Sequence, residues 1–440
     1  MQWRDKMNKF KKFLSLFCVT VLLVGLLAGC GGANSSSASD EEDTVTVLIS
    51  NDSSRTAIEA VTDYIEEEHG IKTVFETRPG GTEGDNIMKT RLATGDMADI
   101  AFYNSGSLLQ ALNPAQNFVD LSKEPYMDKV LDTFKETVSD DSGAIYGIPA
   151  TSVMVGAWFY NKKVYEELGL EIPKTWDDLM ANNEKIKAAG KTAVIGSYKE
   201  TWTSQLIVLG DNYNVLAEDP TFPEEYTANK AKLATTPGAL RSFEKLQEVY
   251  DKGYMNDDFL ATTYDTGTKM LAEGTGVHYP MLSQVLPLLE TNYPDQLNDI
   301  GVFPQPGDSP DKNGFTAWMP HAFYLNKNGD KVETAKKWAE AFLSDEGVKR
   351  FVDAATLDGP LAVEGVDLPE DVPQAVKDML PYFEEGNTAP ALEFLSPLKG
   401  PNLEQITTEV GSGGKTAEEG AKLYDQDVEK QAKQLGLEGW

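Results

Sequence analysis

The stretch that decides the fold runs from Tyr146 to Trp202 and reads YGIPATSVMVGAWFYNKKVYEELGLEIPKTWDDLMANNEKIKAAGKTAVIGSYKETW. Its apolar first part predicts a buried strand that ends in a polar turn at residues 161–163. A short helix, a break containing Pro173, a second helix and another strand should follow, before a loop that carries Glu200 and Trp202. This succession of strands and helices is typical of an α/β fold.

The size and composition of the chain indicate a soluble protein with two domains or two lobes. At 440 residues the chain is too long for one hydrophobic core. Its 41% apolar and 25% charged residues are ordinary for a soluble globular protein and exclude a polytopic membrane protein.

The N-terminus has the composition of an export signal. Residues 1–12 hold five basic residues and one acidic residue, and residues 13–29 are almost wholly apolar. The apolar run is too short to span a membrane comfortably, so residues 1–29 are predicted to be a signal peptide. Leu27-Ala28-Gly29-Cys30 resembles the lipobox of bacterial lipoproteins, which implies that Cys30 is acylated; an uncleaved anchor helix is the alternative. Small and acidic residues 31–43 predict a flexible tether after Cys30.

The cysteine content and the net charge argue against a disulfide and against two kinds of partner. Cys18 would leave with the signal and Cys30 would carry lipid, so we expect no disulfide in the mature fold. Without residues 1–29 the formal net charge falls from -31 to -35, because one acidic and five basic residues are removed. Such an acidic surface argues against nucleic acid and anionic headgroups as partners.

Ordered structure should begin with a β/α alternation. Residues 44–50 and 71–78 predict strands, and Ser53 or Ser54 can cap a helix that runs between them to about His69. A further helix ending near Gly95 and a strand at 98–103 predict parallel pairing with right-handed crossovers. Ligands of such sheets bind at the carboxyl ends of the strands, here residues 50–52, 78–83 and 103–105.

The second half of the chain is expected to contain an extended pair and several helices. Residues 315–327 read as an extended pair, and helices are expected at 331–343 and 345–355. A capping box formed by Thr416 and Glu419 predicts a C-terminal helix that ends near Leu435.

No motif in the sequence argues for catalysis, a metal or a cofactor. GSGGKT at 411–416 lacks the earlier glycine of a phosphate-binding loop, since Glu409 stands there, and no strand precedes it, so it reads as a helix start. The three histidines lie far apart in no metal-ligand spacing and are expected to be surface or packing residues. Nothing in these residues argues positively for an enzyme, and we predict that the chain is not one.

Aromatic residues at strand ends and in loops are the candidates for ligand contact. A sugar presents faces of C–H groups and a rim of hydroxyls, so its receptor needs flat aromatic rings beside amides or carboxylates. Each ring could equally belong to the core. The candidates by position are Tyr103, Trp158, Trp202, Tyr279 and Trp318.

The residues AWFYNKKVYEELGLEIPKTWDDL at 157–179 resemble a segment of the extracellular solute-binding proteins of ABC importers, the family that includes maltodextrin-binding proteins. ADIAFYNSGSLLQAL at 98–112 and AKKWAEAFLSDEGVKRF at 335–351 add to this resemblance. It implies an α/β, two-lobed periplasmic-binding-protein-like fold of type II. It also implies a lipid-anchored, extracytoplasmic and monomeric receptor that captures a carbohydrate and delivers it to ABC permease subunits.

The resemblance also implies roles for particular residues. Tyr103 takes the place of an aromatic that faces sugar, with Asn104 and Ser105 as polar contacts beside it. Glu200 and Trp202 match a loop that supplies a carboxylate and a stacking ring.

Departures from the family pattern bear on the ligand. Met154 stands where a maltodextrin receptor has an acid, with Trp158 further along the same strand. Gln284 stands near a stacking tryptophan of many members, and residues 400–402 replace another. These departures favour a small oligosaccharide over a long glucan.

The expected lobe boundaries place residues 44–152 and 302–345 in lobe one, and residues 156–299 and 349–440 in lobe two. A receptor for another solute, such as a polyol or sugar phosphate, is an alternative, although a phosphate should require a cluster of Arg or Lys. A surface polysaccharide-degrading enzyme or adhesin is an alternative from a different class.

Overall fold

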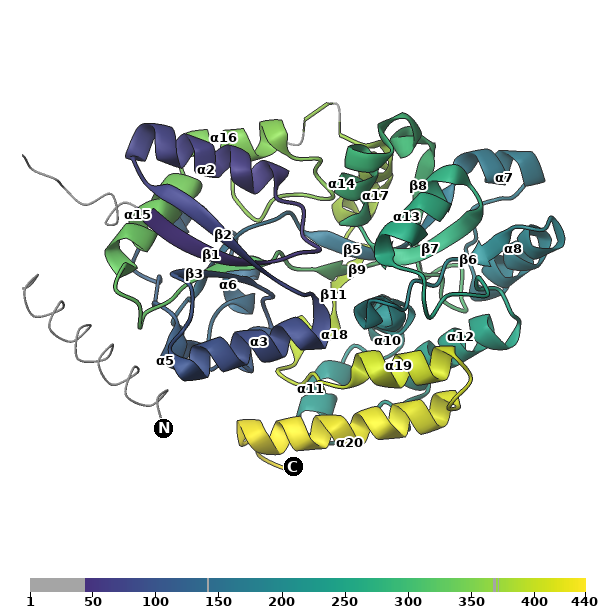
Figure 1. Cartoon of the computed structure of the whole chain (residues 1–440). Coiled ribbons are helices and arrows are strands. Elements are labelled where there is room, and N and C mark those ends of the chain that lie inside the picture. Colours follow the sequence, from purple (N-terminus) through teal and green to yellow (C-terminus); the bar gives the residue numbers. More distant parts are fainter. Residues whose placement is uncertain (1–43, 141, 367–368, 371) are drawn as a thin grey trace, which may run out of the picture. The chain divides into compact units, whose positions relative to one another are not determined.

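The computed structural model describes residues 44–140, 142–366, 369–370 and 372–440. The predicted signal peptide, the lipid site at Cys30 and the tether lie outside these residues. The chain divides into two units, Met1–Glu41 and Glu42–Trp440, and the second is described here by itself. It is built on two sheets flanked by helices (Figure 1).

The first sheet has five strands in the order β2-β1-β3-β10-β4. Its strands are β1 (Thr44–Ser50), β2 (Lys72–Arg78), β3 (Ile100–Tyr103), β4 (Gly147–Pro149) and β10 (Ala322–Leu325). β1 is parallel to both β2 and β3, which confirms the predicted β/α alternation. β10 enters antiparallel between β3 and β4.

Helices cover both faces of the first sheet. α2 (Thr56–His69) and α16 (Asp345–Ala354) lie side by side over one face, and α3 (Gly81–Thr94) lies on the other (Figure 1). α2 buries Ile58, Val61 and Ile65, the apolar positions expected at helical spacing. The remaining helices near this sheet are α4 (Ser107–Gln110), α5 (Pro114–Asn117), η1 (Pro125–Lys129), α6 (Asp132–Thr137) and α15 (Val332–Phe342).

The second sheet is organised around β5 (Met154–Asn161), whose eight residues are all buried. The strand order is β11-β9-β5-β7-β6, and β8 also pairs with β5. β7 occupies one edge of β5, while β9 and β8 share the other edge end to end. The other strands are β6 (Thr192–Val194), β7 (Gly276–Leu282), β8 (Ile300–Pro304), β9 (Phe315–Trp318) and β11 (Thr388–Pro390).

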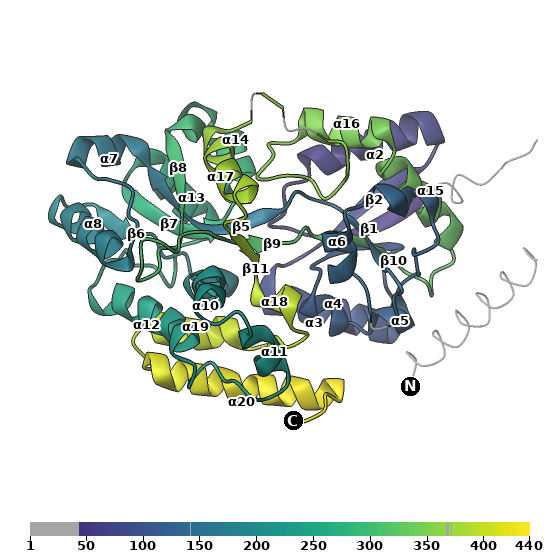
Figure 2. The ribbon, with the colours of Figure 1, turned by 180° about the vertical axis from the view of Figure 1, so that it is seen from behind.

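The helices around the second sheet include two that begin with capping boxes. Thr175 and Asp178 cap α8, and the predicted box of Thr416 and Glu419 is confirmed at α20. Figure 2 shows α19 beside α20. These helices are α7 (Lys162–Leu168), α8 (Trp176–Ala188), η2 (Thr201–Gln205), α9 (Leu206–Leu209), α10 (Asn212–Glu218), α11 (Phe222–Thr227), α12 (Pro237–Asp251), α13 (Tyr264–Glu273), α14 (Val285–Asn292), η3 (Pro294–Asp299), α17 (Gln374–Glu384), α18 (Leu392–Leu395), α19 (Leu403–Gly411) and α20 (Ala417–Leu435).

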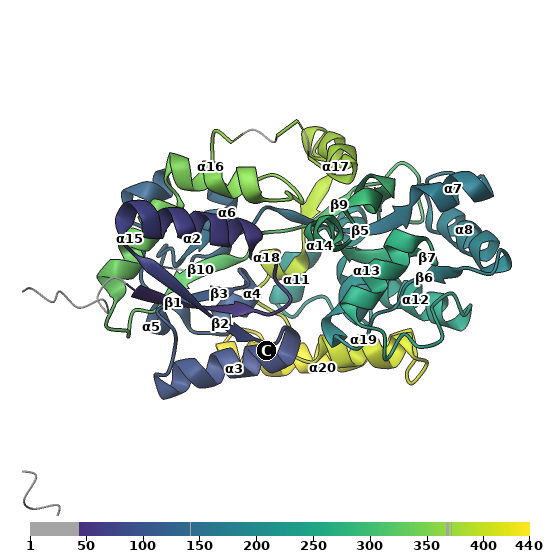
Figure 3. The same cartoon turned by 45° about the horizontal axis from the view of Figure 1, so that its top comes forward.

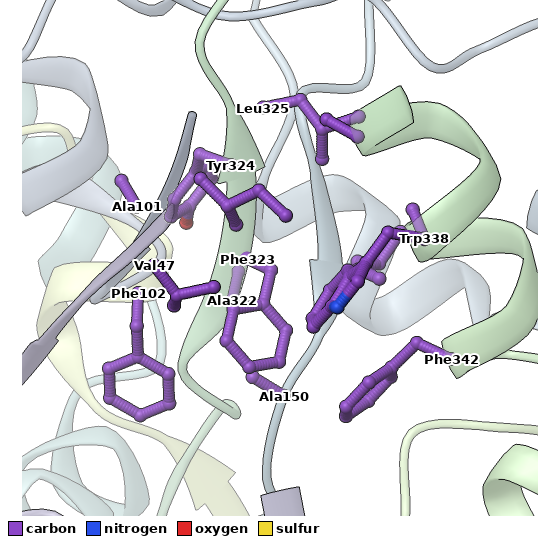
Figure 4. Packing of buried hydrophobic residues seen from close by; sticks show 14 of the residues in the cluster. Val47, Ala101, Phe102, Ala150, Ala322, Phe323, Tyr324, Leu325, Trp338 and Phe342 are labelled. Carbon is purple, nitrogen blue, oxygen red and sulfur yellow. The ribbon is translucent and has the colours of Figure 1, made fainter. Parts of the chain in front are cut away.

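Each sheet has its own hydrophobic core. Around the first sheet, the Phe323 ring meets Trp338 edge-on at 5.0 Å, and Trp338 stacks on Phe342 at 5.1 Å (Figure 4). Two further clusters of buried residues pack around the second sheet, one containing Trp158 and the other Phe159. Separate cores agree with the two lobes expected from chain length.

The chain passes between the sheets at residues 150–153 and again at residues 319–321. The predicted extended pair at 315–327 is therefore split, because β9 joins the second sheet and β10 joins the first (Figure 3). β8 and β9 both pair with β5, although the sequence prediction grouped residues 302–345 with lobe one. The complete lobe boundaries remain a prediction.

Candidate functional site

Three cavities meet between the two sheets, and together they form a cleft. The large cavity has a volume of about 870 Å³. The Trp318 cavity and the Asp358 cavity, named after a residue in each wall, measure about 120 Å³ each. Asp52, Ser53 and Gln284 line all three, so the cavities adjoin one another.

One wall of the cleft consists of loops at the carboxyl ends of β1 and β2. Asn51 to Thr56 and Pro79 to Glu83 line the large cavity, as expected for a sheet with parallel strands. These two loops approach closely, since a Cβ atom added at Gly80 would lie 2.1 Å from Asp52 Oδ2. Glycine at position 80 therefore allows the carboxylate of Asp52 to sit against the second loop.

The opposite wall comes from the second sheet and its helices, with Trp202 of η2 at its centre. The Trp202 ring meets the Tyr264 ring edge-on at 5.4 Å, and both residues line the large cavity. Glu200 accepts a hydrogen bond at 2.8 Å from the backbone N–H of Tyr264, the first residue of α13. The Glu200 carboxylate thus helps to fix Tyr264 beside Trp202.

Trp318 forms part of the smaller cavity between the sheets. Its indole N–H donates to Glu393 Oε1 at 2.8 Å, and Glu393 Oε2 pairs with Lys399 at 2.8 Å. The ring lies against β5, where a Cβ atom added at Gly156 would be 2.5 Å from Trp318 Cζ3. These contacts fix the orientation of the ring at the cavity wall.

Most of the predicted site residues are brought together. Ser105 is almost fully buried and donates to the Pro320 carbonyl at 3.0 Å. Glu200 lines the large cavity. The predicted residues in the wall of the Trp318 cavity are Asn104, Ser105, Met154, Trp202, Gln284 and Trp318.

Three predicted residues do not reach the walls of these cavities. Trp158 is fully buried, donates to Gln305 at 3.1 Å and packs between Trp176 and Phe303. Tyr279 lies in the central strand β7 and shares a hydrogen bond of 2.7 Å with Ser197. Both lie in the core because helices or other strands surround β5 and β7.

Tyr103 stands behind the cleft wall rather than in it. Its hydroxyl donates to Asp85 at 2.7 Å, and the Arg78 guanidinium lies 5.2 Å from its ring centre. Burial raises the pKa of Tyr103 well above its ordinary value, and the Asp85 carboxylate adds to this shift. Asp85 and Arg78 line the Trp318 cavity, so Tyr103 supports residues that face it.

Several lining residues were missed by the residue-level prediction. Asp52 and Arg78 lie at strand ends that the sequence pattern had marked, although neither was singled out. Glu393, Phe394 and Glu404 come from the C-terminal part of the chain, where only the family resemblance at residues 400–402 had indicated a ligand contact.

Two titratable side chains in the wall of the Asp358 cavity are buried and have shifted pKa values. Burial raises the pKa of Asp358 to about 7, although a hydrogen bond from the Ser152 hydroxyl opposes the shift. Burial lowers the pKa of His321 to about 4, with a contribution from the positive charge of Arg78. At neutral pH the histidine is therefore uncharged, while Asp358 is close to its midpoint.

Within the described residues, no cluster of three or more His, Cys, Asp or Glu side chains is arranged to hold a metal ion. Across the same part of the chain, no helix has the length and apolar character needed to cross a bilayer. Residues 411–416 form the end of α19 and the turn before α20, in agreement with their reading as a helix start.

Comparison with known proteins gives matches over most of the chain. The multiple sugar-binding protein of Streptococcus mutans serotype c is 24% identical over 372 residues, which cover 81% of this chain and 84% of that protein. A solved chitin oligosaccharide binding protein shares the fold with a TM-score of 0.75 at 19% identity, covering 89% of this chain and 100% of the other. RafE in complex with raffinose gives a TM-score of 0.72 at 20% identity, and the match covers 88% of this chain and 99% of RafE.

These two solved structures share the overall fold of this chain. The sequence profile of the bacterial extracellular solute-binding proteins matches residues 50–349, about two thirds of the chain. The chain therefore belongs to the family of bacterial extracellular solute-binding proteins.

Proposed function

We propose that this protein captures a carbohydrate, a small oligosaccharide, and delivers it to the permease subunits of an ABC importer. The observation that carries the proposal is the large cavity, where two aromatic rings and several carboxylates and amides face the same space. Aromatic faces suit the C–H surfaces of a sugar, and carboxylates and amides suit its hydroxyls. The names of the relatives, which bind multiple sugars, raffinose and chitin oligosaccharides, support this ligand class.

The proposal includes an extracytoplasmic, lipid-anchored and monomeric protein. The family is extracellular, and the signal-like residues 1–29 with Cys30 support export and acylation. No chemistry on the ligand is proposed.

Ligand binding is proposed to favour a closed arrangement of the lobes, because only that arrangement contacts the ligand from both walls. Lobe one would comprise residues 44–152 and 302–345, except β8 and β9, whose pairing with β5 favours lobe two. Lobe two would also comprise residues 156–299 and 349–440.

The test is thermal melting of the purified protein against mono- and oligosaccharides, polyols, sugar phosphates and peptides. A ligand at about 100 times its dissociation constant should stabilise the protein by about 2.7 kcal/mol. An oligosaccharide should raise the melting temperature and be recovered unchanged. A shift with peptides or sugar phosphates alone would overturn the ligand class, and conversion of a glycan to products would overturn the assignment as a receptor.

A further inference from the structure

The carboxylate of Glu404 joins the two walls of the cleft. Glu404 is 9% exposed and lies in the first turn of α19. Its Oε2 atom accepts a hydrogen bond from the Thr201 hydroxyl at 2.7 Å and another from the Thr82 hydroxyl at 3.2 Å. Thr201 begins η2 of the second-sheet wall, whereas Thr82 belongs to α3 of the first-sheet wall.

The two sides of this contact belong to different cores. α3 buries Met88 in the core of the first sheet. α19 buries Leu403 and Val410 in a core of the second sheet. The Glu404 side chain therefore connects two separately packed bodies rather than two parts of one core.

The N-terminus of α3 has no hydrogen-bonded side-chain cap at its N-cap residue, although Glu83 lies in its first turn and the Asp52 carboxylate lies against Gly80. The residue at the N-cap is Gly80, and no side chain there accepts a hydrogen bond from the helix. The first N–H groups of a helix have no partner within it and carry partial positive charge. A Cβ atom added at Gly81 would lie 3.2 Å from Glu404 Oε2, so the carboxylate sits at this helix end.

Glu404 is also held firmly on its own side. The Ser204 hydroxyl donates to the Glu404 backbone carbonyl at 2.9 Å and shares a hydrogen bond of 2.8 Å with Thr407. Ser204 belongs to η2, the element that carries Trp202. A change in the position of α3 relative to Glu404 is therefore also a change relative to Trp202.

We propose that Glu404 is a latch between the lobes, which places a carboxylate from α19 at the end of α3 and holds it through the Thr82 hydroxyl. The latch favours the closed arrangement even without ligand, and opening the cleft breaks the bond to Thr82 and uncovers the end of α3. This inference rests on the proposed function only in assuming that closure of the lobes assists ligand binding. Glu404 acts as a positioning residue, because its role is to hold the two walls together.

The decisive experiment is hydrogen–deuterium exchange on the ligand-free protein, together with its radius of gyration by X-ray scattering. Glu404→Gln should speed exchange in residues 79–86 about five- to tenfold and increase the radius of gyration. Glu409→Gln is the matched control, since it makes the same change on α19 at an exposed ion pair with Lys415. Unchanged exchange in 79–86 for Glu404→Gln would overturn the latch.

A second variant covers the case in which Glu404→Gln perturbs the whole fold. Thr82→Val removes only the donor on α3 and should give the same local increase in exchange. If both variants fold and the double variant exchanges no faster than either single one, the two side chains act through one contact; additive effects would contradict the proposal.

Ligand titration separates the latch from the proposed function. A sugar that binds the unmodified protein should bind Glu404→Gln about three- to tenfold more weakly. If no sugar binds the unmodified protein, the proposed function fails, whereas the exchange and scattering results still decide the latch.

Discussion

The two walls of the cleft are built from different chemistry. In the large cavity, the described residues from the first sheet are polar, glycine or proline, whereas both aromatic rings, Trp202 and Tyr264, come from the second-sheet side. The first wall consists of strand-end loops, and the second is assembled from η2, α13, α14 and α19. The first wall is therefore suited to hydrogen bonding with hydroxyl groups, and the second to contact with the flat faces of a ligand.

The supports of the two walls also differ. Behind the second wall, Lys245 and Asp211 form an ion pair of 2.6 Å in which each side chain is 1% exposed. A comparable contact on the first-sheet side, Lys336 with Glu124 at 2.9 Å, leaves the side chains 28% and 24% exposed. Of these two ion pairs, the one on the second-sheet side is therefore much more deeply buried.

The largest expected effect tests this difference in burial between the two ion pairs. Lys245→Ala leaves the Asp211 carboxylate buried without its cation, so the free energy of unfolding should fall by about 3–5 kcal/mol. The measurement is urea denaturation. Lys336→Ala on the first-sheet side should cost about 1 kcal/mol or less, because a partly exposed pair is screened by water. Equal losses in the two variants would remove the distinction between the walls.

The second prediction concerns Asp358, beside the segment that passes between the sheets. Its folded pKa of about 7 exceeds the ordinary value of 3.8, so the folded state retains a proton that the unfolded state has lost. Its contribution to stability is therefore complete below pH 4 and is lost as the pH rises to about 7. The loss should approach about 4 kcal/mol.

Asp358→Asn isolates this contribution in pH-dependent denaturation. The pKa values of His321 and His278, lowered by burial to about 4 and about 3, act in the opposite direction, because the unfolded histidines bind protons below about pH 6.5. Subtracting the variant profile from that of the unmodified protein removes the histidine contribution. A flat difference between pH 4 and 7 would show that Asp358 titrates normally in the folded state.

The third prediction compares two tryptophans that were both candidates for ligand contact, of which Trp202 alone was matched to a stacking ring. Trp202→Ala removes a ring from the large cavity and should weaken sugar binding about 10- to 100-fold, as expected when an aromatic contact is truncated. Trp158→Phe alters only the core, where it should lower the melting temperature and leave the dissociation constant unchanged. Calorimetric titration and thermal melting of both variants provide the measurement, and weaker binding by Trp158→Phe alone would reverse the assignment.

The smallest expected effect lies on the polar wall. Asp52→Asn keeps the shape of the side chain but removes its charge, which should weaken binding about five- to tenfold, in line with one charge-assisted hydrogen bond. Asp52 is exposed, so the melting temperature of the ligand-free protein should not change. Calorimetric titration would detect the difference. A loss larger than that of Trp202→Ala would show that the polar wall dominates recognition.

The sequence was most informative where local pattern and topology coincide. The alternation of strands and helices from Thr44 to Tyr103 was sufficient to predict parallel pairing, and hence the strand ends where Asp52 and Arg78 lie. One local prediction in this region was wrong. Neither Ser53 nor Ser54 caps α2, whose N-cap is Arg55, and both serines line the large cavity instead.

The second wall was harder to predict because its parts are far apart in the sequence. Trp202 follows a polar loop and Trp158 lies within an apolar strand, yet both were candidates for ligand contact, and only the three-dimensional neighbours of Trp158 reveal that it is enclosed. Glu393 reaches the cleft from α18, which packs against α4, α11 and β11, and Glu404 reaches it from α19, which packs against α12 and η2. No local periodicity encodes such placement.

The position of β10 between β3 and β4 has a consequence for how the chain acquires its structure. The first sheet cannot be completed until residues 322–325 are available, more than 200 residues after β3 ends at Tyr103. Translation of that interval takes on the order of 10 to 45 s at about 5–20 residues per second. The first sheet therefore remains incomplete for most of the synthesis of the chain. The pairing of segments that are distant in the sequence slows its completion further. Such a delay is compatible with the export proposed for this chain.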